Sequence, residues 1–213
     1  YRRQRQMCKE TGVRNISIDL IFGLSQLTDE VWKDTIEKAL KLDPEHISAY
    51  QLSIEEGSAL AKMVADERYV EASDEQCRHQ YDVLCQTLRQ AGYHHYEISN
   101  FARPGFEAVH NSAYWSRVPY IGLGPGSHSL TGDTRSWNIQ EPPDPFARGH
   151  QSGEDHAPLR TDKGLEAAEL YSLADRAVIH SLLSEGALEK QDGSIRIPES
   201  RLFTSDEIIR ELI

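Results

Sequence analysis

A six-residue unit, His110-Asn111-Ser112-Ala113-Tyr114-Trp115, carries the side chains of this sequence that are best suited to binding chemistry. A neutral imidazole can bind iron axially, and aromatic rings beside it can cover a flat ligand. The amide of Asn111 can orient the imidazole or a polar edge of that ligand. The unit therefore suits a planar ligand that carries a metal. A purely structural alternative remains open, in which His110 bonds a backbone carbonyl and both aromatic rings pack in the core.

Two further stretches contain residue types that could contact a ligand. The run Gly122-Leu123-Gly124-Pro125-Gly126 looks like a phosphate-binding loop, but it has no P-loop lysine and Pro125 removes a backbone donor. It is better explained by a close approach of two backbone segments. Asp19 lies within an apolar run, and a buried carboxylate needs a partner. It either caps a loop or helix locally or contacts a ligand at the carboxyl end of a sheet or barrel.

The elements that would position Asp19 form a βαβ unit. Residues Asn15–Gly23 predict a buried strand, and a helix follows that Thr28 caps and that ends at Asp43-Pro44. A second strand is expected over His46–Ile54. Two strands joined by a helix are typically parallel neighbours with a right-handed crossover.

The second half of the sequence continues with a helix, a short strand and a Pro-rich stretch. Ser73 and Gln76 predict a capping box at the start of a helix that reaches Gly92, and His94–Ile98 predicts a strand that leads to the aromatic unit. Residues 141–158 are rich in Pro, Gly, His and acid and predict a linker.

The last segment predicts a small module of its own. A helix is expected over Leu165–Glu185, then a hairpin around Asp192-Gly193, and then a final helix that Thr204 and Glu207 box. This order resembles part of a winged helix. Because the final helix is acidic, we expect a packing module and not a DNA-reading one.

Composition excludes several classes of function. The 213 residues carry a formal net charge of −11, which argues against a general nucleic-acid binder because phosphate contacts need a basic face. No apolar run approaches the roughly 18 residues that span a bilayer, and nothing at the start resembles a signal peptide. The three cysteines, Cys8, Cys77 and Cys85, form no CxxC pair, which is typical of a reducing cytosol. We therefore expect a cytoplasmic protein, with Cys77 and Cys85 as small core residues of one helix.

Several motifs together resemble a known family. Ile18-Asp19-Leu20-Ile21-Phe22-Gly23-Leu24, the stretch Tyr96–Gly105, the aromatic unit at 110–115 and Gly122-x-Gly-x-Gly-Ser-His-Ser are similar to the HemW family of radical-SAM haem chaperones, which are relatives of oxygen-independent coproporphyrinogen III oxidase. The similarity runs to about Asn138 and resumes at Leu159. The His-Asn-x-x-Tyr-Trp unit separates the chaperones from the oxidases within this group.

The resemblance implies an α/β fold class: the last strands of an incomplete radical-SAM (βα) barrel, an α+β region and a small winged-helix-like C-terminal module. It implies four parts. These are the C-terminal part of the barrel over 1–70, a central region with the aromatic unit over 71–140, a linker over 141–158 and the C-terminal module over 159–213.

The resemblance also implies cofactors and sites. Members of the family bind S-adenosylmethionine and a [4Fe-4S] cluster, and the chaperones bind haem and pass it to respiratory proteins. Matched by motif position, Asp19 resembles the aspartate that contacts S-adenosylmethionine, and His110 resembles the residue that binds haem iron. Asn111, Tyr114 and Trp115 belong to the same haem motif. No catalytic residue is implied, and Arg103 or Arg117 is our hypothesis for pairing the haem propionates.

One departure from the family limits the expected activity. The cluster-binding Cys-x3-Cys-x2-Cys is missing from this sequence, so we expect a C-terminal fragment that is inactive alone as a radical-SAM enzyme. Strands around Ile16–Ile21 and Ile47–Ile54 should then have open edges and promote self-association. A homodimer and a peripheral membrane association through partners are left open. The alternatives are a true coproporphyrinogen III oxidase of porphyrin biosynthesis and a non-catalytic interaction domain.

Overall fold

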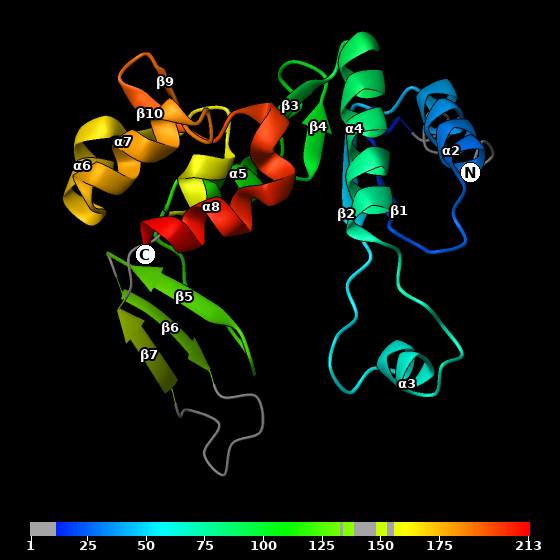
Figure 1. Cartoon of the computed structure of the whole chain (residues 1–213), viewed down its shortest axis with the longest axis horizontal. Coiled ribbons are helices and arrows are strands. Elements are labelled where there is room, and N and C mark those ends of the chain that lie inside the picture. The colour runs from blue at the N-terminus through cyan, green and yellow to red at the C-terminus, as the bar shows by residue number, and fades with distance from the viewer. Residues whose placement is uncertain (1–11, 133, 139–147, 153–155) are drawn as a thin grey trace. The chain divides into compact units, whose positions relative to one another are not determined.

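The computed structural model describes residues 12–132, 134–138, 148–152 and 156–213 (Figure 1). Cys8 and much of the predicted linker lie outside these residues. The chain forms two compact units, Tyr1–Ala108 and Val109–Ile213. Within the described residues, no helix combines the length and the apolar character needed to cross a membrane.

The first unit is built on a four-stranded mixed sheet in the order β1-β2-β4-β3. β1 and β2 are parallel, with Ser17 opposite His46, and they are joined by α2, so the predicted βαβ unit is confirmed. β4 lies antiparallel to both β2 and β3. The elements are β1 (Ser17–Phe22), α2 (Asp29–Leu42), β2 (His46–Gln51), β3 (His94–Glu97) and β4 (Asn100–Ala102).

The expectation of two open sheet edges was only half right. β1 has a neighbour on one side alone among the described strands, but β2 pairs with β1 on one side and with β4 on the other. β4 is three residues long and has no apolar alternation, so it gave no strand signal in the sequence. The prediction of an exposed edge over Ile47–Ile54 is therefore wrong for residues 47–49, which bond to β4 and Ser99, but the register of β4 does not extend beyond these residues.

Two helices cover one face of this sheet (Figure 1). α4 (Asp74–Gln90) lies beside α2, and Phe22 of β1 has ring contacts at 6.0 Å with Trp32 of α2 and with Tyr81 of α4. Cys77 and Cys85 are buried on α4, as predicted. A short helix, α3 (Ala59–Ala65), contributes no buried residue.

The residues that the sequence predicts as N-caps of α2 and α4 do cap these helices. Thr28 and Ser73 accept from the backbone N–H three residues later, as predicted. The reciprocal half of the predicted capping box is not made, because Gln76 donates to the backbone oxygens of Leu24 and Leu27. The side chain of Gln76 thus connects two segments and does not close its own helix start.

The second unit contains α5, two small antiparallel sheets and three further helices. One sheet has the order β5-β6-β7 and the other β8-β10-β9. The elements are α5 (Val109–Trp115), β5 (His128–Thr131), β6 (Thr134–Asn138), β7 (Arg148–Ser152), the 3-10 helix η1 (Ala157–Arg160), β8 (Leu165–Glu166), α6 (Ala167–Leu173), α7 (Arg176–Ser184), β9 (Glu189–Gln191), β10 (Ser194–Arg196), the 3-10 helix η2 (Glu199–Thr204) and α8 (Ser205–Leu212).

The predicted helix over Leu165–Glu185 is divided in the structure. β8 comes first, and α6 ends at Leu173, where Ala174 turns to an extended conformation. Asp175 then accepts from Ala177 N at 2.6 Å and starts α7. An aspartate whose carboxylate caps a new helix competes with continuation of the old one, which explains the break.

Three other features of this unit can be compared with the sequence predictions. The hairpin at Asp192-Gly193 is confirmed, and both residues have the positive φ angles, 48° and 89°, that this turn requires. Thr204 precedes α8 as predicted but makes no side-chain cap. The range expected to be a linker, 141–158, contains β7, which pairs along its length with β6.

Candidate ligand-binding sites

His110 and Tyr114 lie one helical turn apart on the exposed side of α5. Side chains four residues apart share a helix face, and a long side chain in a helix points back toward the N-terminus. Tyr114 therefore reaches His110, and its hydroxyl lies 3.0 Å from the imidazole Nε2. The two rings meet edge to face at 4.9 Å, and Tyr114 keeps 43% of its surface exposed. The imidazole is at the surface and not sealed in the core, which was the structural alternative.

Asn111 and Trp115 lie one position further round the same helix, on its more buried side. Their polar atoms, Asn111 Nδ2 and Trp115 Nε1, are fully buried and have no hydrogen-bond partner among the described residues. A buried N–H without a partner costs about 1–3 kcal/mol. The structure thus divides the predicted four-residue haem site into an exposed pair and a half-buried pair whose donor atoms are buried.

Tyr114 is held in place from its other side. Its ring packs edge to face on Tyr120 at 4.8 Å. Tyr120 exchanges two backbone hydrogen bonds with Leu130 of β5, at 3.0 and 2.9 Å, and Leu130 is buried. The imidazole of His110 is therefore connected through two aromatic rings to a fixed point of the neighbouring sheet.

The glycine-rich stretch after Tyr120 is a close backbone approach, as predicted. A Cβ on Gly122 would lie 2.0 Å from the carbonyl oxygen of His128, so no other residue fits there. Asn138 of β6 fixes the same loop by donating to Gly124 O at 2.8 Å and to Ser127 Oγ at 3.0 Å. The loop leaves the side chain of Leu123 88% exposed on a fixed backbone.

Arg117, two residues after the end of α5, adopts a left-handed conformation with φ of 54°. Val118 N bonds Ala113 O, and Arg117 N bonds Tyr114 O, the bond pattern that commonly ends a helix with glycine. The Arg117 guanidinium donates to Glu169 at 2.7 Å. A larger side chain is thus kept at a position that favours glycine, where it makes an ion pair within the second unit.

The first unit offers a different polar surface, on the sheet face opposite α2 and α4. Asp19, Ser48, Asn100 and Glu97 are register partners across β1, β2, β4 and β3, so they form one row. Asp19 is exposed, which corrects the expectation that it is buried. The other three are buried. Asp19 is the only one of the four that the sequence analysis identified.

A β-bulge brings Glu97 into this row. The register of β3 against β4 shifts between His95 and Glu97. A bulge can direct two consecutive side chains to one face, and here Tyr96 bonds His46 while Glu97 bonds Asn100. Burial raises the pKa of Glu97, although hydrogen bonds from Asn100 and Ser99 partly oppose this. No pattern in the sequence marks such a bulge.

A hydrogen-bonded chain lies next to the row. His46 Nδ1 lies 2.9 Å from Ser17 Oγ, and its Nε2 lies 2.8 Å from the hydroxyl of Tyr96. Burial lowers the pKa of His46, while the carboxylates of Asp19 and Glu107 act in the opposite direction. The imidazole is therefore held neutral between two hydroxyl groups.

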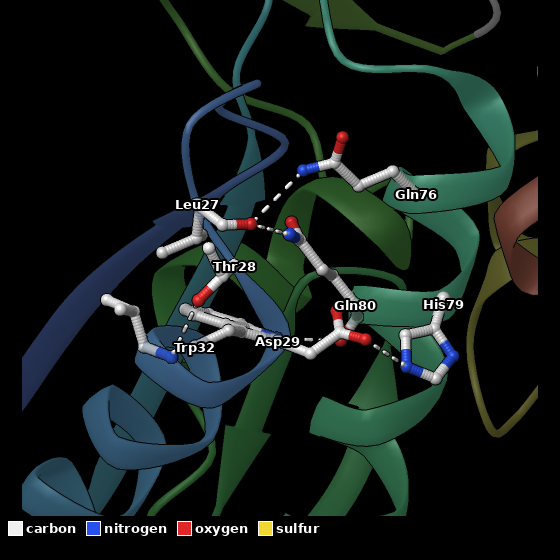
Figure 2. A network of polar contacts seen from close by, with 8 residues as sticks. Leu27, Thr28, Asp29, Trp32, Gln76, His79 and Gln80 are labelled. Carbon is white, nitrogen blue, oxygen red and sulfur yellow. Dashed lines mark hydrogen bonds and ion pairs between the residues drawn. The ribbon is translucent and has the colours of Figure 1, made fainter.

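The loop after β1 is fixed by α4 (Figure 2). Gln80, which is completely buried, accepts from Gly23 N at 2.9 Å and donates to Leu27 O at 2.9 Å. Trp32 of α2 donates to the backbone oxygen of Gln80 at 2.8 Å. The carboxyl end of β1, where ligands typically bind in sheets of this kind, thus has a defined backbone.

The sequence of this chain is similar to those of several known proteins. No family model matches the chain. The heme chaperone HemW of Mycobacterium tuberculosis (strain ATCC 25618 / H37Rv) is 30% identical over 219 residues, which cover 95% of this chain and 56% of that protein. The heme chaperone HemW of Bacillus subtilis (strain 168) is 38% identical over 134 residues, which cover 63% of this chain and 35% of that protein. The chain is therefore similar to HemW proteins over nearly its whole length.

The HemW relatives are matched over part of their length only. The chain spans about half of the Mycobacterium protein and about a third of the Bacillus one. A radical S-adenosyl methionine domain-containing protein 1 of Danio rerio is also similar, with 38% identity over 113 residues. Its name agrees with the radical-SAM assignment of the HemW family.

A solved structure confirms the predicted fold class. The chain superposes on coproporphyrinogen III oxidase (HemN) from Escherichia coli, a radical SAM enzyme, with a TM-score of 0.68 and 18% identity. The superposition covers 99% of this chain and 57% of HemN. The HemW-type chain therefore has the α/β fold of part of a radical-SAM protein.

The described cysteines do not suit an iron–sulfur cluster of the kind the HemW family implies. Cluster ligands are thiolates, but Cys77 and Cys85 are buried on α4, and burial raises the pKa of Cys77. They lie eight residues apart and face the core. We therefore assign no cluster ligand among the residues that the structure describes.

Proposed function

We propose that this chain binds haem at α5, with His110 as the ligand of iron, and that it acts as part of a haem chaperone that delivers haem to respiratory proteins. The observation that carries the proposal is the exposed imidazole of His110, which is held by Tyr114 and open to solvent. Its position in the His-Asn-x-x-Tyr-Trp unit of a chain similar to HemW proteins supports the same ligand.

The surroundings of α5 suit the apolar body of a porphyrin. Large apolar side chains are exposed along this part of the chain, and burying them against a flat ligand would be favourable. They are Val109 at 84%, Val118 at 49%, Ile121 at 76% and Leu123 at 88%.

The remaining members of the predicted site have separate parts in the proposal. Asn111 and Trp115 have buried donors without partners, which suits an oxygen acceptor. Arg117 can share its guanidinium between Glu169 and a propionate. Arg103 already bonds Ala91 O at 2.6 Å and lies over the ring of Tyr93, so it is the less available of the two arginines.

S-adenosylmethionine belongs to the proposal through the first unit. Asp19 is exposed on the polar sheet face at the same row as Ser48, and its carboxylate can accept from hydroxyl or ammonium groups. A [4Fe-4S] cluster is assigned to no residue here, because the described cysteines are buried in the core.

Titration of the purified chain with haemin tests the proposal. A Soret band shift that is lost in His110→Ala is the expected result. His180→Ala is a matched control, since His180 is also an exposed histidine beside a tyrosine ring, Tyr171 at 5.9 Å. A titration without a Soret shift, or with one that His110→Ala leaves unchanged, contradicts the proposal and favours an interaction domain without ligand.

The second candidate function is that of an oxygen-independent coproporphyrinogen III oxidase, which the likeness of fold to HemN favours. Incubation of the protein that contains this chain with coproporphyrinogen III and S-adenosylmethionine distinguishes the two. Formation of protoporphyrinogen would replace the chaperone proposal, and unchanged substrate with His110-dependent haem binding would support it.

A further inference from the structure

The two ring nitrogens of His110 have different surroundings. Nε2 lies 3.0 Å from the hydroxyl of Tyr114, whereas Nδ1 has no hydrogen-bond partner among the described residues. A metal bonded to an imidazole lies about 2 Å from the nitrogen along its lone pair. A metal on Nε2 would therefore occupy the space in which the hydroxyl of Tyr114 lies.

The position of Tyr114 is fixed by more than this one hydrogen bond. Its ring is packed between the imidazole at 4.9 Å and Tyr120 at 4.8 Å, with interplanar angles of 76° and 89°. Tyr120 is in turn bonded at its backbone to Leu130 of β5. Moving the hydroxyl away from Nε2 would require Tyr114 to leave both ring contacts.

We propose that His110 binds iron through Nδ1 while its Nε2–H donates to the hydroxyl of Tyr114, which makes Tyr114 a positioning residue for the iron ligand. This inference rests on the proposed function and specifies the atom that carries it. An imidazole that binds a metal through one nitrogen commonly donates its other N–H to a nearby acceptor, which fixes the tautomer and the ring orientation. Here the phenol oxygen is that acceptor.

The assignment separates the members of the motif by role. His110 contacts the iron and Tyr114 orients the ring, on one side of α5. Asn111 and Trp115 lie on the other side and take no part in iron binding in this arrangement. A flat ligand bound to Nδ1 would approach the helix from the side away from Tyr114.

Replacement of His110 by Nδ1-methylhistidine tests the assignment directly, because the methyl group blocks one nitrogen and leaves the ring. The haemin-dependent Soret shift should fall to the level of His110→Ala. Replacement by Nε2-methylhistidine should keep the shift, because Nδ1 stays free. The reverse pattern would overturn the assignment, whereas a wild-type chain without any His110-dependent shift would refute the proposed function itself.

The role of Tyr114 has separate measurements. In Tyr114→Phe we expect a His110-dependent Soret shift with haemin binding about 3- to 10-fold weaker and a more positive reduction potential, because the ligand loses the acceptor of its N–H. Tyr171→Phe, beside His180, is the control and should change neither quantity. Complete loss of the shift in Tyr114→Phe, with Nδ1-methylhistidine still binding, would identify the phenolate as the ligand and overturn the proposal.

The hydrogen bond can also be measured without haem. In the chain labelled with ¹⁵N-histidine, the ring of His110 should show the tautomer protonated at Nε2. A ring protonated at Nδ1 would mean that Tyr114 donates to Nε2 and that Nδ1 is not available to iron, which would overturn the assignment even if haem binds.

Discussion

Replacing Gln80 by leucine should destabilise the first unit by about 2–3 kcal/mol. Gln80 is 0% exposed and makes two side-chain hydrogen bonds, an acceptor bond to Gly23 N and a donor bond to Leu27 O, both at 2.9 Å. Leucine has a similar volume, so the change removes the amide and creates little cavity.

The magnitude follows from the two backbone groups that would be left without Gln80. The N–H of Gly23 is buried and cannot reach water, so the loss of its hydrogen bond to Gln80 costs about 1–3 kcal/mol. The carbonyl of Leu27 is partly buried and still accepts from Gln76 at 3.1 Å, so the loss of its hydrogen bond to Gln80 costs less, about 0.5–1 kcal/mol. The bond from Trp32 to the backbone of Gln80 is unaffected.

Urea unfolding, followed by the fluorescence of the buried Trp32, measures the loss in this unit, and amide exchange at Gly23 reports the local opening. Gln86→Leu is the matched control, because Gln86 is on the same helix and exposed. If Gln80→Leu and Gln86→Leu change the free energy of unfolding equally, the side-chain hydrogen bonds of Gln80 to Gly23 and Leu27 do not hold the loop after β1; Figure 2 shows the bond to Leu27.

Three further changes test other parts of the structure. The folded protein lowers the pKa of His46 below its ordinary 6.5. The stability that the neutral imidazole contributes is therefore complete above pH 6.5 and is lost as the pH falls toward the folded pKa. Urea unfolding across this range should show the free energy of unfolding change by up to about 1.4 kcal/mol per pH unit, and His46→Gln should remove this dependence. Arg117 has a φ of 54°, so Arg117→Gly should unfold at higher urea concentration than Arg117→Ala, by about 1 kcal/mol in stability, although both lose the ion pair to Glu169. Gly193→Ala should lower the thermal midpoint through a cost of about 1 kcal/mol, since its φ is 89°, and an unchanged midpoint would mean that the hairpin does not depend on this turn.

The sequence predicted the local elements best where backbone and side-chain signals agree. Thr28 caps α2, and the strands on either side are parallel as the βαβ order requires. The turn at Asp192-Gly193 has the positive φ angles that only a few residue types tolerate. The cap and the turn are decided by interactions within a few residues along the chain, and the parallel pairing follows from the helix that connects the two strands.

The predictions that failed depend on partners that are distant in sequence. β2 is an inner strand because residues 100–102 pair with it some fifty positions later. Asp19 lies in an apolar run and is nevertheless exposed, because a local pattern does not record which part of a sheet face the rest of the chain covers. Glu97 joins the polar row through a bulge, and a bulge is a property of two paired strands and not of either one alone.

The spacing of residues in the aromatic unit already indicates which of its side chains share one side of a helix. His110 and Tyr114 are four residues apart, and so are Asn111 and Trp115, so any helix over this unit must place the two pairs on different sides. Four polar or aromatic side chains in six residues invite the assumption of one shared pocket, but the helix turns Asn111 and Trp115 away from His110 and Tyr114. The pair with the exposed imidazole is the one that a ligand can reach, and the buried donors of the other pair must be satisfied by something else. In the proposed haem site, the helical spacing of the motif therefore matters as much as its residue types.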